Sequence, residues 1–525
     1  MPRLQARFHP DAPALVQDAT RWSNRDWEDA VALAARELAA RGLRAGDRLA
    51  IIAENGLVLA TLVHAASRLA AWPVILNARL TAREIDAILA HCVARLVACA
   101  VDVSGDAERH ATRLEARTTR WGAIPEFTLT DARDAAPESV SGDPARDVGA
   151  VIYTSGTTGM PKGVLLTHRN LLHVAHWSGA LRRLRTTDRV FGGLPISHVF
   201  GLASVFLAST LNGACLHLVA RFDPAAALAL IAREGLTVFQ GVPQMFARML
   251  ERAVPDGIGP ARGAPAAPPA HGTARGAGRA AGRDAASPGL ATIRYLSAGG
   301  APLDMTLKRE TEALFGVALN NGYGMTELAP TVSTTLIDAY RDDDAVGPPL
   351  PGLELRLVDG HGCDVARGDV GTLRVRGPTV MRGYYRDEAL TRATIDADGF
   401  LDTGDLARQD ADGTLFIVGR AKDLIIRSGF NVHPEEVEAV LRAHRDVTIA
   451  AVVGRPGVAA NEDVVAFVQL APGADADEAA LLAWCAERLA PYKRPARIVA
   501  LDALPASSTG KVRKAALREL AAALA

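Results

Sequence analysis

Residues 149–170, GAVIYTSGTTGMPKGVLLTHRN, form the stretch that decides the fold class. Its first seven residues are apolar and typical of a strand, and Thr167 is typical of a residue that caps the start of a helix. Between them, residues 153–163 hold three glycines, four Ser or Thr residues, one lysine and no carboxylate. A strand, a glycine-rich loop and a helix present backbone N–H groups to a phosphate. We therefore predict a phosphate-binding loop in an α/β protein, with a flexible surface loop as the alternative that composition leaves open.

This loop differs from that of the P-loop nucleoside triphosphatases. Their motif places a lysine directly after the last glycine, followed by serine or threonine. Here Gly159 is followed by Met160 and Pro161 before Lys162. The predicted phosphate loop is therefore of another kind.

The segments around the loop alternate between helix and strand patterns. Residues 27–43 predict a helix that ends at Gly42, and residues 47–55 and 73–77 predict buried strands with a second helix between them. The same alternation recurs through residues 145–330. Strand, helix, strand is typical of a parallel sheet with covered faces, so we expect a large α/β unit.

The second half of the chain has a different texture. Residues 256–289 are almost all Ala, Gly, Pro and Arg, which predicts a disordered insertion. After about residue 340, short β-like runs with turn signals predict a small barrel or sheet. From about residue 423 the order strand, helix, strand, strand, helix predicts a small α+β domain, with the boundary in GRAKD at 419–423.

Length and composition exclude several classes of protein. A chain of 525 residues is too long for one core and predicts two to four units. A formal charge of −1 argues against a large nucleic-acid footprint. The five cysteines form no CxxC pair, which favours buried thiols in a reducing compartment over a zinc site.

The stretch from Val190 to Ala220 has no charged residue and is long enough to cross a bilayer. It contains Pro195, His198 and Asn212 and lacks a flanking basic cluster, so we interpret it as a loop, a buried helix and a buried strand. The N-terminus has no apolar signal-peptide region, which favours a cytoplasmic protein. No coiled coil or interface patch is visible, so a homodimer stays an open alternative.

Further motifs follow the loop in order: LPISHVFG at 194–201, SAGGAP at 297–302, NGYGMTE at 321–327, DTGD at 402–405, GRAKDLIIRSGFNVHPEEVE at 419–438 and SSTGK at 507–511. With YTSGTTGMPKGV, they resemble the adenylate-forming (AMP-binding) enzyme superfamily, in its acyl-CoA synthetase or fatty-acid–CoA ligase branch. The resemblance spans essentially the whole chain apart from residues 256–289.

The resemblance implies a large N-terminal AMP-binding domain at 1–421, made of two α/β subdomains and a small β-barrel-like subdomain. A small mobile α+β lid domain at 422–525 would follow it. It also implies an acid–thiol ligase that uses ATP, Mg²⁺ and coenzyme A, forming an acyl-adenylate and pyrophosphate and then an acyl-CoA thioester. Two alternatives stay open: transfer to a carrier protein, and a catalytically inactive acyl- or nucleotide-binding homologue.

The resemblance also assigns roles to single residues. Lys511 would bridge the phosphate and carboxylate oxygens, Thr326 would contact the α-phosphate, and His198 would lie near the acid's carboxylate. Glu327 and Thr154 are the candidate ligands of Mg²⁺, and Lys422 is the candidate hinge. The expected cofactor-binding residues are Thr154, Ser155, Gly156, Thr157, Thr158, Gly159, Lys162, Gly300, Ala301, Pro302, Asn321, Gly322, Tyr323, Gly324, Met325, Asp405, Arg420, Lys422, Ser428 and Gly429.

Among these, Tyr323 offers a flat face for adenine, Asp405 and Arg420 would bind the ribose, and Gly429 would pass close to the pantetheine arm. The acyl pocket would be lined by His198, Phe200, Ser204, Val242, Gly299, Gly300, Pro330 and Thr331. Because this set has no Lys or Arg, we expect an uncharged fatty, alicyclic or aryl tail. For His198, a satisfied core histidine is the alternative.

Overall fold

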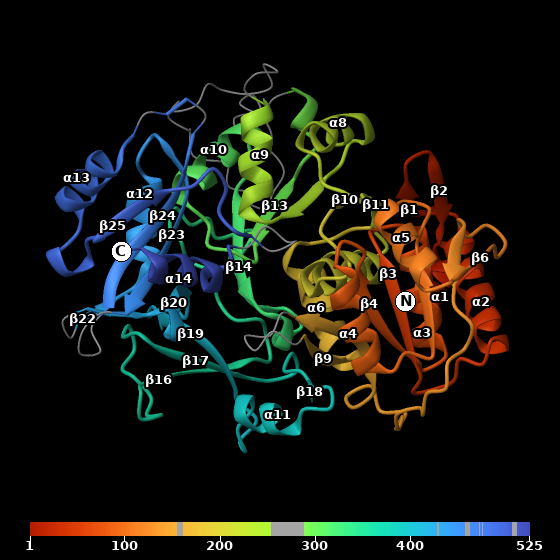
Figure 1. Cartoon of the computed structure of the whole chain (residues 1–525). Helices are drawn as coiled ribbons and strands as arrows, with labels where there is room; N and C mark the ends of the chain where they lie inside the picture. Colours follow the sequence, from red (N-terminus) through yellow and green to blue (C-terminus); the bar gives the residue numbers. More distant parts are fainter. Residues whose placement is uncertain are drawn as a thin grey trace. The chain divides into compact units, whose positions relative to one another are not determined.

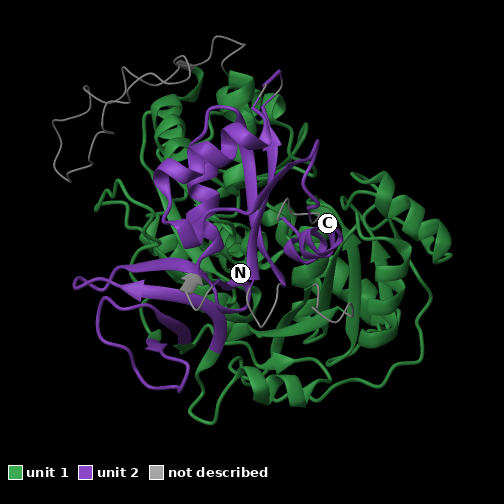
Figure 2. Cartoon of the chain, turned by 60° about the vertical axis from the view of Figure 1, so that its left-hand side comes forward, with its two compact units in different colours: residues 1–354, 375–401 green, residues 355–374, 402–525 purple. Residues whose placement is uncertain are grey.

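The computed structural model describes residues 1–154, 161–253, 288–427, 430–456, 462–471, 473–474, 476–506 and 512–524. They form two compact units, coloured separately in Figure 2: unit 1 comprises residues 1–354 and 375–401, and unit 2 comprises residues 355–374 and 402–525. The predicted insertion at 256–289 lies outside the described residues except at its end. The predicted domain boundary between residues 421 and 422 stays a prediction.

Unit 1 contains two eight-stranded sheets (Figure 1). The first has six neighbouring parallel strands with an antiparallel strand at each edge. Its strands in spatial order are β15 (Thr331–Thr334), β14 (Leu319–Gly324), β13 (Tyr295–Gly299), β12 (Val238–Gly241), β10 (Arg189–Gly192), β11 (Cys215–Leu218), β1 (Pro13–Gln17) and β2 (Thr20–Ser23).

The second sheet has four parallel strands at its centre and antiparallel strands on both sides. In spatial order it contains β18 (Gly383–Tyr384), β9 (Lys162–Thr167), β8 (Val148–Thr154), β4 (Trp72–Asn77), β3 (Arg48–Ala53), β5 (Leu96–Cys99), β7 (Phe127–Leu129) and β6 (Arg117–Thr119). All six residues of β3 are buried, as expected for a strand covered on both faces.

Helices cover both sheets of unit 1. These helices are α1 (Pro2–Phe8), α2 (Asn24–Ala40), α3 (Leu57–Arg68), α4 (Ala82–Cys92), α5 (Gly105–Arg113), α6 (His168–Leu181), η1 (Phe200–Leu207), α7 (Ala208–Asn212), α8 (Pro224–Glu234), α9 (Pro243–Ala253), η2 (Pro288–Leu290), α10 (Met305–Phe315), η3 (Thr326–Leu328) and α11 (Glu388–Thr394). Helix α6 packs against β8 and β9 and against η1, and η1 packs against β10. A helical layer therefore lies between the two sheets.

Local sequence sets the helix boundaries. The Ser23 and Asp26 side chains form a reciprocal capping box at the start of α2, and Thr167 and Asn170 do the same for α6. Gly42, two residues after the end of α2, has φ of +83°, as predicted for a helix stop.

One local prediction is wrong. The chain does not pass from the glycine-rich loop directly into a helix, because β9 intervenes and pairs antiparallel with β8, with Thr154 opposite Lys162. The loop thus joins two strands of a hairpin. The start of α6 lies at the far end of β9, so its backbone N–H groups do not form the phosphate cradle.

The uncharged stretch at 190–220 folds as expected, with a loop, the buried helices η1 and α7, and the buried strand β11. In the described part of the chain, no helix is long and apolar enough to cross a membrane.

Unit 2 begins with a four-stranded sheet where the sequence predicted a small barrel or sheet: β16 (Glu354–Val358), β17 (Gly371–Arg376), β19 (Leu401–Gln409) and β20 (Leu415–Arg420). After η4 (Ala421–Asp423) comes the hairpin of β21 (Ile425–Arg427) and β22 (Phe430–Val432). The remaining elements are α12 (Pro434–Arg442), β23 (Val447–Pro456), β24 (Glu462–Leu470), α13 (Glu478–Arg488), η5 (Pro491–Lys493), β25 (Arg497–Ala500) and α14 (Lys514–Ala523).

Strand β23 is buried on both faces. Val452 packs into one core cluster with residues of α12 and α13, whereas Ala451 and Val453 pack into another with Leu517 of α14. This alternation follows from the two-residue period of a strand, and it explains the continuous apolar run at 449–453.

Candidate active site

The carboxyl ends of parallel strands meet at one edge of the first sheet. The segments with His198, Val242, Gly300 and Thr326 follow β10, β12, β13 and β14 in turn. Ligands bind at this edge in open α/β sheets. The fold therefore brings four separate motifs to one edge.

The base of the phosphate loop is the β8–β9 pair. Thr154 ends β8, Lys162 begins β9, and both side chains are half-buried. The Lys162 Nζ lies 5.5 Å from the centre of the Tyr384 ring. Ser155, Gly156, Thr157, Thr158 and Gly159 lie outside the described residues.

Glu327 lies in η3, which packs against β9. A tight backbone approach precedes it: a Cβ at Gly324 would lie 1.9 Å from the Pro330 carbonyl oxygen, and the Met325 N–H donates to that oxygen at 2.9 Å. Only glycine fits at this position. Thr326, between Met325 and Glu327, is buried.

Tyr384 of β18 holds the Glu327 carboxylate. Its hydroxyl donates to Glu327 Oε1 at 2.9 Å, and the Met381 N–H donates to the Glu327 carbonyl oxygen at 2.9 Å. Burial, and then the Glu327 charge, raise the pKa of the Tyr384 hydroxyl, so it stays protonated and donates. Because Tyr384 also pairs with Val164 of β9, it links the predicted metal ligand to the base of the phosphate loop.

The sequence did not reveal Tyr384. It stands in RGYYRD, where an aromatic residue is as readily explained by packing. Its partner Glu327 lies 57 residues earlier in the chain, so only the fold identifies the pair.

The predicted adenine side of the site follows β13 and β14. Gly300 has φ of +81°, directly after β13, and Ala301 and Pro302 continue from it. Gly322 and Tyr323 lie in β14 and pair with β15.

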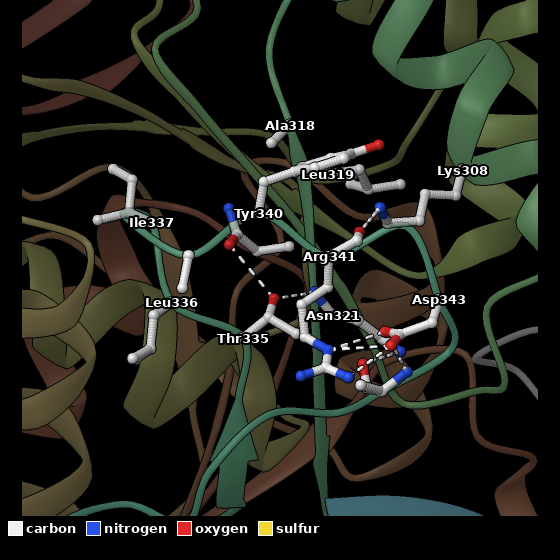
Figure 3. Close-up of a pocket in the computed structure, with 13 residues that line it drawn as sticks. Lys308, Ala318, Leu319, Asn321, Thr335, Leu336, Ile337, Tyr340, Arg341 and Asp343 are labelled. Atoms are coloured by element: carbon white, nitrogen blue, oxygen red, sulfur yellow. Dashed lines mark hydrogen bonds and ion pairs between the residues drawn. The ribbon is translucent and has the colours of Figure 1, made fainter. Parts of the chain in front are cut away.

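Asn321 points to a different place from the motif's other residues. Its side-chain amide donates to the Ala345 carbonyl oxygen at 3.2 Å, and it lines a small polar pocket at the amino end of β14 (Figure 3). This pocket is also lined by Lys308, Thr335, Tyr340 and Arg341. Because it lies at the opposite end of β14 from Thr326, it is separate from the predicted nucleotide site.

The predicted acyl-pocket residues are neighbours in the structure. Ser204 Oγ and Thr331 Oγ1 form a hydrogen bond of 3.1 Å. A Cβ added at Gly299 would lie 3.3 Å from the Phe200 ring, and one at Gly300 would lie 3.7 Å from Val242. These contacts join segments from four strand ends into one lining.

His198 begins the turn that leads into this lining. The Phe200 N–H donates to His198 Nδ1 at 3.3 Å, which leaves Nε2 as the protonated nitrogen of the neutral ring. The side chain is half-buried rather than enclosed in the core.

Unit 2 holds the predicted ribose-binding pair. Asp405 in β19 is directly opposite Arg420 in β20, and its buried carboxylate lies 3.0 Å from Arg420 Nε. The arginine thus orients the carboxylate. Lys422 is exposed in η4, whereas Ser428, Gly429 and Lys511 lie outside the described residues.

Comparison with known proteins identifies the family. Residues 3–385 match the model of the AMP-binding enzyme family, and residues 436–511 match that of its C-terminal domain. The chain therefore belongs to the AMP-binding enzyme family, in the acyl-CoA synthetase branch of acid–thiol ligases. The predictions of family, α/β fold class and enzyme class are confirmed.

Three relatives are similar over nearly their whole length. A CoA ligase of Mycobacterium tuberculosis, named for a methyl-dioxo-octahydroindenyl propanoyl group, is 34% identical, covering 97% of this chain and 96% of its own. Feruloyl-CoA synthase of an Amycolatopsis species is 33% identical, covering 98% and 97%. The crystal structure of ATP-bound MatB from Rhodopseudomonas palustris is 31% identical, with a TM-score of 0.81 and 99% of both chains covered.

Proposed function

We propose that the chain is an ATP-dependent carboxylic acid–CoA ligase. The acid's carboxylate oxygen attacks the α-phosphorus of ATP, the bond to the β-phosphate breaks, and pyrophosphate leaves. The coenzyme A sulfur then attacks the acyl carbon of the adenylate, and AMP leaves. Relatives that are CoA ligases, and an ATP complex of a similar structure, support these substrates.

The proposal rests mainly on the group formed by Lys162, Tyr384 and Glu327. It places a cation and a held carboxylate beside the base of the predicted phosphate loop. Such a pair is suited to a triphosphate with its divalent metal, because Lys162 can offset phosphate charge while Glu327 binds the ion.

The donors present fit Mg²⁺. The Glu327 carboxylate and the Thr154 hydroxyl are hard oxygen ligands, and Mg²⁺ is commonly held by one or two carboxylates together with substrate phosphates. The described residues contain no group of three or more His, Cys, Asp or Glu side chains able to hold a metal alone. When bound, Mg²⁺ would neutralise charge that develops on the phosphates. Tyr384 would fix one carboxylate oxygen and leave the other for the ion.

The other roles are proposals based on the resemblance. Thr326 would donate to the α-phosphate, Tyr323 would stack on adenine, and Asp405, oriented by Arg420, would accept both ribose hydroxyls. Lys511 would stabilise the transition state of adenylation, and Lys422 would act as the hinge between the half-reactions. For the acid, an alicyclic or aryl compound is favoured, as in the names of two relatives.

Acid-dependent exchange between pyrophosphate and ATP tests the first half-reaction, and loss of the free coenzyme A thiol tests the second. A panel of fatty, alicyclic and aryl acids should give exchange with at least one of them. Exchange without thiol loss would favour a carrier-protein acceptor, and no exchange with any acid would indicate an inactive homologue.

The variant Tyr384→Phe tests the role of the group formed by Lys162, Tyr384 and Glu327. We expect adenylation to slow by about tenfold, the size of one hydrogen bond to a charged group, with a higher Mg²⁺ concentration at half-saturation. Tyr385→Phe is the matched control, because the Tyr385 hydroxyl donates to Glu138 instead. Equal Mg²⁺ dependence in the two variants would contradict the role of Tyr384.

Lys511→Ala separates the two steps. This variant should lose exchange yet convert supplied acyl-AMP to the thioester, whereas Arg513→Ala, an exposed neighbour, should retain both. Normal exchange in Lys511→Ala would refute the proposed role of the lysine.

A further inference from the structure

Polar side chains gather inside unit 1, between the first sheet and the helices α6 and η1. In the parallel pair β12–β13, Gln240 is opposite Ser297, and Tyr295 lies two residues before Ser297, so these three side chains face the same way. Gln240 Nε2 donates to the Ser204 carbonyl oxygen at 3.5 Å, which identifies that face as the one covered by η1. A covered sheet face is normally apolar, so this cluster calls for an explanation.

Ser204 is the centre of the cluster. Its hydroxyl contacts Thr331 Oγ1 at 3.1 Å and accepts from Ser178 Oγ at 3.4 Å. Its carbonyl oxygen accepts from both Gln240 and Arg182. This residue lies in a π-helical segment, a form of helix often found at functional sites. Since Ser204 and Thr331 belong to the acyl lining, the cluster begins at the wall of that lining.

Arg182 brings a positive charge to this wall. The side chain is buried, and its guanidinium group lies 5.9 Å from the centre of the Tyr295 ring. Burial lowers the pKa of Arg182, although an arginine keeps its charge in proteins. Among the described residues, no carboxylate forms an ion pair with it. A buried cation without a counter-ion is costly, and the described residues leave the charge of Arg182 without one.

Two more polar atoms in the cluster are unsatisfied by described residues. Gln240 Oε1 and Ser297 Oγ are buried and have no hydrogen-bond partner there. Gln240 is completely buried, at 0% exposure. Buried polar atoms are nearly always paired, so the Ser297 hydroxyl can donate to an oxygen acceptor that the described residues do not supply, whereas Gln240 Oε1 only accepts.

We infer that the enzyme selects acids whose tail carries an oxygen acceptor, a ketone or a second carboxylate, which meets Arg182, Ser204 and Thr331 at the end of the acyl lining. This inference rests on the proposed ligase function and narrows its substrate class. It differs from the expectation of an uncharged fatty, alicyclic or aryl tail, which was drawn from lining residues without a Lys or Arg. The sequence did not distinguish Arg182 from the exposed arginines of the run RRLR at 182–185.

The test compares acids matched in shape, measured by pyrophosphate release. One set is octanoic acid, its ketone at the penultimate carbon, and octanedioic acid. A second set is cyclohexylpropanoic acid and its ring ketone. We expect kcat/KM to be about tenfold or more higher for the preferred oxygen-bearing acid than for its hydrocarbon match. Preference for the ketone or for the diacid identifies the charge of the tail group, and either result supports the inference.

The variant Arg182→Met should bring this ratio of kcat/KM close to one, while the hydrocarbon acid keeps its own kcat/KM within about threefold. Arg185→Met, at an exposed position three residues on, is the control and should keep the parent ratio. A purely structural arginine would lower both acids equally. If Arg182→Met fails to fold, Thr331→Val should lower the ratio instead.

An unchanged ratio in every folded variant, or a parent enzyme that prefers the hydrocarbon acids, would overturn the inference while leaving the ligase function intact. Absence of pyrophosphate release with every acid would instead refute the proposed function, and the inference with it.

Discussion

Unit 1 buries the long cationic side chains of Arg48, Arg182 and Lys308, and the last two differ in whether a carboxylate pairs with them. Lys308 Nζ of α10 lies 3.1 Å from Glu312 Oε1, one turn along the helix, and both side chains are almost fully buried. The Glu312 carboxylate also accepts from the Leu319 N–H at 2.8 Å and from the Tyr340 hydroxyl at 3.0 Å. Arg182 of the helical layer has no such carboxylate among the described residues. A described carboxylate balances Lys308, and none of the described carboxylates pairs with Arg182.

The difference between the surroundings of Lys308 and Arg182 indicates which of the two regions binds a ligand. The Lys308 network satisfies itself, and its bond to Leu319 fixes the first residue of β14, the strand that leads to Tyr323 and Thr326. It is thus a support for the site, although it lines a pocket. The Arg182 cluster leaves charge and hydrogen-bonding capacity unused, which is the condition expected of a surface that binds something else.

The largest effect should come from Lys308→Met. Removing the cation leaves Glu312 buried without its counter-ion, so we expect unfolding free energy to fall by about 3–5 kcal/mol, measured by urea denaturation. Arg309→Met is the control, because its ion pair with Asp342 is half-exposed on both sides and should be worth about 0–1 kcal/mol. The double variant Lys308→Met/Glu312→Leu should be more stable than Lys308→Met; a less stable double variant would contradict the pairing.

A smaller loss of stability should appear on acidification, because the histidines that unit 1 buries include His64 and His217. Burial lowers the pKa of His64 to about 3 and that of His217 to about 4, so both are neutral in the folded chain. Between these values and the usual pKa of about 6.5, the unfolded chain binds protons that the folded chain does not. The contribution of these two histidines to the unfolding free energy is therefore full above about pH 6.5 and is lost as the pH falls toward 4.

The variant His64→Met isolates one of these histidines. The loss of unfolding free energy between pH 7.5 and pH 5 should shrink by about 2 kcal/mol relative to the parent chain. His361→Gln removes an exposed histidine instead and should leave the pH profile unchanged. Identical profiles for parent and His64→Met would show that His64 is not buried in its neutral form.

The smallest change in stability should come from Arg182→Met, measured by urea denaturation. Since no carboxylate is left unpaired, and the variant removes an uncompensated charge, we expect a change within about 1 kcal/mol of zero. A loss as large as that of Lys308→Met would show that Arg182 has a structural partner, and the contrast between the two cations would fail.

Much of this fold could be predicted because its signals are local. The pattern at 168–181 gave α6, whose capping threonine is in the sequence, and the apolar runs gave β3, β4 and β12. Strand β9 was missed because its apolar part, Val164–Leu166, is short and lies between a glycine and a helix cap. Only pairing with β8 and β18 makes these residues a strand.

The site residues that sequence reasoning missed are defined by distant partners. Tyr384 is distinguished by its hydrogen bond to Glu327, and Arg182 by the lack of a carboxylate partner among the residues that the structure describes. Neither property can be predicted from the residues next to Tyr384 or Arg182 in the sequence. Conversely, the roles of Lys511 and Lys422 came from motif resemblance alone and stay predictions.

The place of β18 also bears on how the chain is made. Strand β9 lies second from the edge of its sheet, and Gly383 and Tyr384 supply the edge strand beside it. Gly383 pairs with Leu165, which lies 218 residues earlier in the chain. At about 5–20 residues per second, a ribosome needs roughly 10–40 s to synthesise that interval. During this time the backbone edge of β9 is uncovered, and unpaired edges promote aggregation. A nascent chain that stalls before residue 383 should therefore depend on chaperones far more than one that stalls just after residue 401.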